Sequence, residues 1–305
     1  MLNINMEVEM NTRRKFFTLL IVAIIVFLAG TGFYLNEKTT KESVVTSTNE
    51  DVKTTQSENQ NIEVQLKEDS KSNKFDGLPL KDNSVGVPVL YYHSIQKSGE
   101  NELMMDPKLF RSHLQWLKDN GYTSLTMEEF YNYIKYNTPV PEKSVVITFD
   151  DGYIDNYTNA MPIINEFDFD ATIFMVSDFV GNPNFLTEPQ LKESEKHKIN
   201  IESHTVNHLE LAKLPKEKQR EELQQSKNHL ENLLNKKVDY VAYPYGSYND
   251  DTKNITGETG YKMGFSTNSG WASGDDDLFS IPRVYLSDFY DLNEFIRRVT
   301  TPKYY

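Results

Sequence analysis

Short apolar runs alternate with stretches of helical periodicity from about residue 85 to the end of this chain of 305 residues. Alternation of strands and helices is typical of an α/β architecture. About seven strands with helices between them would close into a barrel, in which functional residues lie at the carboxyl ends of the strands. The predicted strands are Val87–Tyr92, Val145–Phe149, Ala171–Val176, Ile199–Glu202, Val238–Ala242, Lys262–Phe265 and Ser280–Val284.

Helix signals lie between these runs. Asp106-Pro107 is a typical helix start, and Thr126 with Glu129 predicts a capping box at a second helix. Leucines at helical spacing predict the buried stripe of a longer helix. These are Leu223, Leu230, Leu233 and Leu234.

Residues 16–35 form an almost uninterrupted apolar run that follows a cluster of basic residues. A helix with a rise of about 1.5 Å per residue and this length can cross a hydrocarbon core about 30 Å thick. The basic flank predicts that residues 1–15 are cytoplasmic and that the rest of the chain is extracellular. We therefore expect a single-pass protein of the cell membrane, with secretion after signal cleavage as the alternative.

Residues 36–84 are rich in Ser, Thr, Asn, Gln, Lys and Glu and contain few large apolar residues. Such a segment cannot bury enough apolar surface to offset its chain entropy. We expect a disordered polar linker over residues 36–84 and a folded catalytic domain over residues 85–305.

The composition limits the partners and the kinds of site. The net charge of −13 argues against a nucleic-acid partner, because no basic stripe is present for phosphates. The chain has no cysteine, so disulfides and thiolate metal sites are excluded. Any metal therefore has to be held by His, Asp or Glu.

Two adjacent carboxylates, Asp150 and Asp151, follow the predicted strand 145–149 and precede Gly152. Neighbouring anions repel each other in a dry site, and a bound cation removes that conflict. Gly152 would allow the backbone to turn so that both carboxylates face one cavity. An ordinary Asp-Asp-Gly turn after a strand is the structural alternative.

His204 and His208 follow another predicted strand. If that segment is helical, the two imidazoles lie on one face, which is a common arrangement of metal ligands. With one aspartate they would leave coordination positions open for water, as a hydrolytic metal requires. An incidental pair of histidines is the alternative.

Three ordered motifs resemble those of the polysaccharide deacetylases, the NodB-homology family of carbohydrate esterases. The resemblance spans about residues 85–299 and implies a distorted (β/α)7-type barrel. It also implies one divalent metal, commonly Zn²⁺, with Co²⁺ or Ni²⁺ as alternatives. The motifs are Thr148-Phe149-Asp150-Asp151-Gly152-Tyr153, Ser203-His204-Thr205-Val206-Asn207-His208 and Tyr243-Pro244-Tyr245-Gly246.

The resemblance implies a role for each matched residue. Asp151, His204 and His208 would hold the metal. Asp150 would be the catalytic base, and the backbone N–H of Tyr245 would help to stabilise the oxyanion.

Two family positions differ in this chain. Many members carry an arginine where this chain has Ala242, and many end with a Leu-x-His motif, whereas no histidine follows His229 here. However, residues 87–95 resemble the opening strand of the branch that acts on poly-N-acetylglucosamine. That likeness implies His93 as the general acid and Arg283 as the missing cation beside the base.

Structural alternatives apply to both of these residues. His93 could be a polar strand end satisfied by backbone groups, and Arg283 could belong to a surface ion pair. If His93 is the acid, we expect a neighbouring carboxylate to raise its pKa above the usual value of about 6.5.

Four further residues are candidate substrate contacts because aromatic faces suit the apolar surfaces of sugar rings, with core packing as the alternative. They are Tyr153, Tyr243, Pro244 and Trp271. Phe174 is expected to pack in the core. His113, His197 and His229 fall in polar helical patterns and are expected to be solvated.

The resemblance predicts a metal-dependent hydrolase that removes N-acetyl groups from N-acetylglucosamine polymers and releases acetate. The expected polymers belong to the cell envelope or biofilm matrix, namely poly-β-1,6-N-acetylglucosamine or peptidoglycan. One alternative is a non-catalytic carbohydrate-binding or adhesion module, which the missing arginine and Leu-x-His motif favour. Another is an O-acetyl polysaccharide esterase.

Overall fold

The computed structural model describes residues 74–97 and 101–304. The predicted transmembrane segment 16–35 and the predicted linker up to residue 73 lie outside these ranges. Within the described residues, no helix is both long and apolar enough to cross a membrane.

Seven parallel strands form a closed barrel. Their order is β2-β5-β6-β7-β8-β9-β10, and pairing of β10 with β2 closes the ring. The predicted α/β barrel is confirmed, because each predicted strand overlaps an observed one. The strands are β2 (Val89–Tyr92), β5 (Ser144–Phe149), β6 (Ala171–Met175), β7 (Ile199–Ser203), β8 (Tyr240–Ala242), β9 (Met263–Ser269) and β10 (Ile281–Tyr285).

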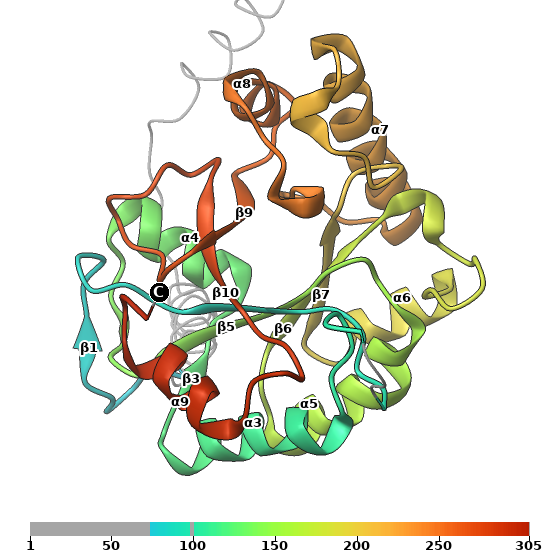
Figure 1. Cartoon of the computed structure of the whole chain (residues 1–305). Helices are drawn as coiled ribbons and strands as arrows, with labels where there is room; N and C mark the ends of the chain where they lie inside the picture. Colours follow the sequence, from blue (N-terminus) through green and yellow to red (C-terminus); the bar gives the residue numbers. More distant parts are fainter. Residues whose placement is uncertain (1–73, 98–100, 305) are drawn as a thin grey trace, which may run out of the picture. The chain divides into compact units, whose positions relative to one another are not determined.

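Helices connect the strands and lie around them (Figure 1). The predicted helix start is confirmed at Asp106, whose carboxylate accepts a hydrogen bond from the Lys108 N–H. Thr126 and Glu129 form the predicted capping box. The helices are α3 (Pro107–Asp119), α4 (Met127–Tyr136), α5 (Met161–Phe167), α6 (Glu188–Glu195), α7 (Lys216–Leu234), α8 (Asp250–Glu258) and α9 (Leu292–Thr300).

Residues along each strand alternate between the barrel interior and the layer beneath the helices. On β5, Val146 belongs to the same buried cluster as Phe174 of β6, whereas Val145 and Ile147 belong to the cluster packed against the outer helices. Side chains along a strand repeat with a period of two residues. Asp150 therefore continues the interior side of β5 just past its last residue, which places its carboxylate at the rim of the barrel.

The folded domain begins before the predicted boundary at residue 85, so the linker prediction is wrong for residues 74–84. Strand β1 (Leu80–Lys81) pairs antiparallel with β4 (Val140–Pro141). Lys74 makes ion pairs with Glu129 at 2.6 Å and Asp170 at 3.0 Å. These contacts join residues far apart in the sequence, so the amino-acid composition of residues 36–84 does not predict them.

Candidate metal centre and active site

The three predicted metal ligands meet at the carboxyl ends of β5 and β7. One Nδ1, Nε2 or carboxylate oxygen atom from each of Asp151, His204 and His208 lies within 4.8 Å of the other two. The Asp151 Oδ1 atom is 3.4 Å from the His204 Nε2 atom and 3.1 Å from the His208 Nε2 atom. Ligands about 2.0–2.1 Å from a tetrahedral ion are about 3.3 Å apart, so this spacing suits a divalent metal.

The hydrogen bonding of His204 also suits a metal. Its Nδ1 atom is 2.8 Å from the Ala242 carbonyl oxygen and therefore carries the proton. The Nε2 lone pair is then directed toward Asp151, whose Oδ1 atom is buried and makes no well-directed hydrogen bond to the described residues. A metal-binding histidine typically directs the lone pair of one ring nitrogen toward the other ligands and donates a hydrogen bond from its second ring nitrogen to a carbonyl. A metal here would be held by Asp151, His204 and His208.

The segment 204–208 is an irregular loop, so the helical arrangement considered for His204 and His208 is not how they meet. His208 reaches the site because its backbone is left-handed, with φ of 57°. The buried Glu222 carboxylate fixes the loop by accepting hydrogen bonds from the Val206 N–H at 3.1 Å and the Asn207 N–H at 2.9 Å. Glu222 was not predicted; its position on the buried face of α7, eight residues before Leu230, is the signal in the sequence.

Backbone strain is present at and beside the candidate ligands. Asp151, Thr205 and Tyr245 have φ of 71°, 66° and 59°, in the left-handed region that non-glycine residues rarely adopt. Such residues persist where the surrounding structure over-determines them, and they cluster at functional sites. The predicted turn at Gly152 is confirmed: its φ is 84°, and a Cβ atom there would lie 2.0 Å from the Met175 sulfur.

Arg283 and Asp150 form a buried ion pair. The guanidinium makes two hydrogen bonds of 2.8 Å to the two carboxylate oxygens of Asp150. The Tyr91 ring lies 4.2 Å from the guanidinium carbon. Burial would raise the pKa of Asp150, but the charge and hydrogen bonds of Arg283 and the charge of His204 lower it below its ordinary value. The surface alternative for Arg283 is excluded, because its side chain is completely buried.

His93 follows the last residue of β2, where that strand pairs with β5. Tyr92 is the register partner of Phe149, and the Asp150 N–H donates to the Tyr92 carbonyl at 2.9 Å. His93 and Asp150 therefore leave neighbouring strands at the same level of the rim. The prediction of a raised pKa is wrong: burial lowers the pKa of His93, although the charges of Asp150 and Asp151 act in the opposite direction.

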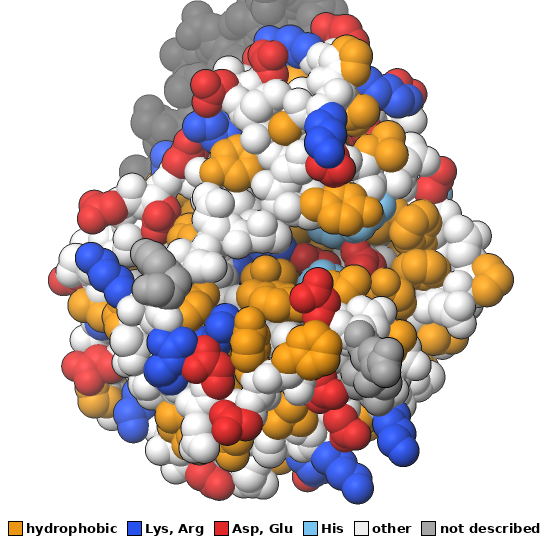
Figure 2. Space-filling model, viewed as in Figure 1, with side chains coloured by type: hydrophobic (Ala, Val, Ile, Leu, Met, Phe, Trp, Pro, Cys, Tyr) orange, Lys and Arg blue, Asp and Glu red, His pale blue; other side chains and the backbone are white. Residues whose placement is uncertain are grey.

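Tyr153 and Tyr245 lie beside the candidate metal ligands. Tyr245 is 66% exposed, and its ring meets the His208 ring at a centroid distance of 4.6 Å. Burial and then the charge of Asp151 raise the pKa of the Tyr153 phenol. Figure 2 shows histidine and carboxylate atoms together in a hollow bordered by hydrophobic side chains.

Of the predicted substrate contacts, two are in the core and a third, Trp271, is partly buried. Tyr243 and Pro244 are buried, and the Tyr243 hydroxyl is hydrogen-bonded to the Phe279 carbonyl at 3.0 Å. Trp271 donates its indole N–H to the Arg298 carbonyl at 2.8 Å. Tyr243 and Pro244 lead into the turn that carries Tyr245, and both are buried.

The remaining histidines divide between core and surface. His113 was predicted to be solvated, but it is completely buried and stacks on Phe295 at a centroid distance of 3.9 Å. Its helix turns this polar side chain inward, where the Tyr92 hydroxyl lies 3.2 Å from the Nδ1 atom. His197 and His229 are exposed, as predicted, and Phe174 packs in the core.

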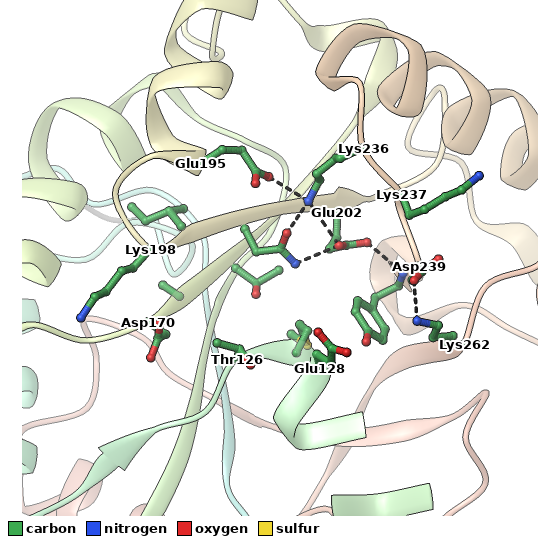
Figure 3. A pocket seen from close by; sticks show the side chains of 16 residues that line it. Thr126, Glu128, Asp170, Glu195, Lys198, Glu202, Lys236, Lys237, Asp239 and Lys262 are labelled. Atoms are coloured by element: carbon green, nitrogen blue, oxygen red, sulfur yellow. Dashed lines mark hydrogen bonds and ion pairs between the residues drawn. The ribbon is translucent and has the colours of Figure 1, made fainter. Parts of the chain in front are cut away.

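A pocket of about 410 Å³ opens at the other end of the barrel, where it is lined by the first residues of β6 and β7. Several of its charges are paired with one another (Figure 3). Lys236 contacts Glu195 at 2.8 Å and Glu202 at 3.5 Å, and Lys262 contacts Asp239 at 2.6 Å. We interpret this pocket as a structural ion network, separate from the metal-ligand cluster.

Comparison with known proteins agrees with this geometry. Residues 137–264 match the family model described as polysaccharide deacetylase. YxkH of Bacillus subtilis (strain 168), which is named for this family, is 40% identical over 226 residues, covering 74% of this chain and 79% of that protein. The poly-β-1,6-N-acetyl-D-glucosamine N-deacetylase of Staphylococcus aureus (strain MRSA252) is 32% identical over 213 residues, covering 65% of this chain and 73% of that protein.

Solved structures show the same fold. The deacetylase PplD of Streptococcus pyogenes, solved in complex with acetate, superposes with a TM-score of 0.68 at 34% identity and covers 70% of this chain and 98% of that one. IcaB from Ammonifex degensii superposes with a TM-score of 0.62 at 24% identity and covers 69% of this chain and 94% of that one. Sequence, fold and the arrangement of Asp150, Asp151, His204 and His208 lead to one conclusion: this chain is an enzyme of the polysaccharide deacetylase family.

Proposed function

We propose that this enzyme hydrolyses N-acetyl groups on N-acetylglucosamine polymers, with a divalent metal bound by Asp151, His204 and His208. The observation that carries the proposal is the position of Asp150. Its carboxylate is bound at both oxygens by Arg283 and lies next to the candidate ligand Asp151. A base held this firmly beside a metal site suits activation of a water molecule for hydrolysis.

Each residue then has a distinct task. When bound, the metal supplies Lewis-acid polarisation of the acetamide carbonyl and acidifies a water molecule. Asp150 accepts the proton of the attacking water. The Tyr245 N–H donates to the developing oxyanion, a contribution of about 3 kcal/mol in comparable sites. His93 donates a proton to the departing glucosamine nitrogen, so that acetate and an amino sugar are released.

The resident metal is proposed to be Zn²⁺, with Co²⁺ or Ni²⁺ as alternatives. Two nitrogen ligands and one oxygen ligand favour these ions over Mg²⁺ or Ca²⁺, which prefer sites made of oxygen.

The proposed substrates are poly-β-1,6-N-acetylglucosamine and peptidoglycan. The relative from Staphylococcus aureus is named for the first of these polymers. The net charge of −13 supports a neutral polymer, because the chain does not attract an anionic one.

The proposed location is the cell membrane, with residues 16–35 as a single-pass anchor and the catalytic domain outside the cell. The apolar run and its basic flank support this orientation. Secretion after cleavage of this segment is the alternative.

Acetate release from β-1,4- and β-1,6-linked N-acetylglucosamine oligomers by the full-length protein tests the proposal. The Asp150→Asn variant is the control, since it removes the base and no candidate ligand, and it should lose activity while retaining metal. Turnover of O-acetylated polysaccharide alone would show an esterase. Oligomer binding without any acetate release would show a non-catalytic carbohydrate-binding module.

A further inference from the structure

The segment that carries His93 is bound to the turn after β5 by buried side chains. The Asp155 carboxylate accepts hydrogen bonds from the Ser94 hydroxyl and from the Ile95 N–H, both at 2.7 Å. The Asn156 side-chain amide donates to the His93 carbonyl at 2.7 Å. Asp155 and Asn156 are 7% and 1% exposed, so these hydrogen bonds are shielded from water.

The other backbone groups of this segment are also bonded. Asn159 donates to the Ile95 carbonyl at 2.8 Å. The Ser94 N–H donates to Leu103, and its carbonyl accepts from Met105. Every backbone N–H and C=O of residues 94 and 95 thus has a partner, and a shift of this segment would break several buried hydrogen bonds. The side chains that form this clamp on residues 93–95 are Asp155, Asn156 and Asn159.

The clamp lies on the same stretch of chain as Asp150 and Asp151. Asn156 begins a π-helical turn over Asn156–Ala160. From this turn the Asn156 and Asn159 amides reach the His93 and Ile95 carbonyls of the same segment. π-turns are rare and occur frequently at functional sites. The base Asp150, the candidate ligand Asp151 and the clamp therefore lie on one short stretch of chain. Because the clamp binds the segment that carries His93, this stretch sets the position of His93 relative to the base.

The imidazole of His93 depends on this backbone support. Its Nδ1 atom is buried and has no hydrogen-bond partner among the described residues. Its ring meets the Tyr91 ring edge-on at a centroid distance of 5.9 Å. We propose that Asp155 and Asn156 are positioning residues that hold His93 where it can donate its proton to the leaving nitrogen. This inference rests on the proposed function, in which His93 is the general acid.

The Asn156→Ala variant of the full-length protein tests the inference by comparing two reactions. Acetate release from N-acetylglucosamine oligomers should fall about 10- to 100-fold, because a misplacement of about 1 Å can cost about 100-fold in rate. Hydrolysis of an activated acetyl ester should change by less than about 3-fold, since its leaving group departs without a proton. Asp155→Asn, which keeps the side-chain size, should change the amide-to-ester ratio in the same direction by less.

Asn83→Ala is a matched control, because the Asn83 amide also donates to a distant backbone carbonyl, that of Ile134 at 3.0 Å. It should leave the ratio of amide to ester hydrolysis unchanged. In a His93→Ala background, Asn156→Ala should cause no further loss of amide hydrolysis, because the group that it positions is already absent.

Equal loss of both reactions in Asn156→Ala, no loss of amide hydrolysis, or a further loss in the His93→Ala background would overturn the positioning role. Failure of the wild-type protein to release acetate from any oligomer would instead refute the proposed function. If Asn156→Ala does not fold, Ser94→Ala removes only the hydroxyl bonded to Asp155, and its amide-to-ester ratio decides the question in the same way.

Discussion

Arg283 and Asp150, 133 residues apart in the sequence, form a two-point ion pair in which both N···O distances are 2.8 Å. The side chains are 0% and 4% exposed. Arg283 also donates to the Ser266 carbonyl at 2.9 Å, so the guanidinium is anchored to the strand next to its own. This arrangement fixes the orientation of the carboxylate that we propose as the base.

Replacing Arg283 should affect both stability and turnover. Arg283→Ala should lower the free energy of unfolding by about 3–5 kcal/mol, because it leaves the Asp150 charge buried without a partner. Arg283→Lys keeps the charge but loses the planar fork, and turnover should fall about 10- to 100-fold. Urea unfolding and acetate release measure the two effects. The ion-pair interpretation requires Arg283→Ala to cost much less stability in an Asp150→Asn background; an equal cost would contradict it.

Removing one candidate ligand should empty the metal site. Asp151→Ala and His208→Ala should each lower metal occupancy sharply, since an open site with three protein ligands cannot spare one. Metal content by elemental analysis after dialysis measures this. His229→Ala, which removes an exposed histidine on α7, should retain the wild-type content. Full occupancy in both ligand variants would place the metal elsewhere.

Removing the proposed acid should separate two kinds of substrate. His93→Ala should lower acetate release from N-acetylglucosamine oligomers about 10²- to 10⁴-fold, the usual contribution of general acid catalysis. An activated ester should be hydrolysed at nearly the wild-type rate, because its leaving group needs no proton. Metal content and melting temperature should stay close to wild type. Near-normal amide hydrolysis would rule out the acid role of His93.

His113 should make the fold sensitive to acid. Burial lowers its pKa in the folded state to about 3, below the value of about 6.5 expected in the unfolded chain. Folding therefore favours the neutral form of His113. Its contribution to the free energy of unfolding is fully present above about pH 6.5 and is lost as the pH falls toward 3. At pH 5 the loss should reach about 2 kcal/mol.

Urea unfolding between pH 7.5 and pH 5 checks this sensitivity. His113→Phe keeps a ring against Phe295 and should show a smaller loss of stability over this range, whatever its stability at pH 7.5. His229→Gln is the control and should follow the wild-type profile. If the free energy of unfolding falls equally with pH in the wild type and in His113→Phe, His113 does not contribute to the acid sensitivity.

Truncation should reveal where the folded domain begins. A chain that starts at residue 74 should melt like the domain in the full-length protein. A chain that starts at residue 85 loses the β1–β4 pairing and both ion pairs of Lys74. Its melting temperature should fall, by about 2–4 °C for each kcal/mol lost in a domain of this size. Equal melting temperatures of the two chains in a calorimetric scan would show that the folded domain begins at residue 85.

Local pattern was sufficient for the strands, for two helix starts and for the carboxylate and histidine pairs, whereas the family resemblance assigned the ligands among them. Apolar runs of strand length and capping residues act over a few positions, so the sequence displays them directly. The spacing of Asp150, Asp151, His204 and His208 was informative for the same reason, because each pair follows a single strand. The sequence could not show that the loop 204–208 is held by Glu222 from a helix elsewhere.

What the sequence by itself determined is a barrel of seven strands with a carboxylate and histidine site at its rim. Only the tertiary structure decided which side chains share that rim. Pairing of β2 with both β5 and β10 brings His93 and Arg283 to Asp150. The same packing turns Tyr243 and His113 into the core. The physical reason is that a side chain's surroundings depend on strand register and on packing partners distant in the chain, and neither is encoded in a local pattern.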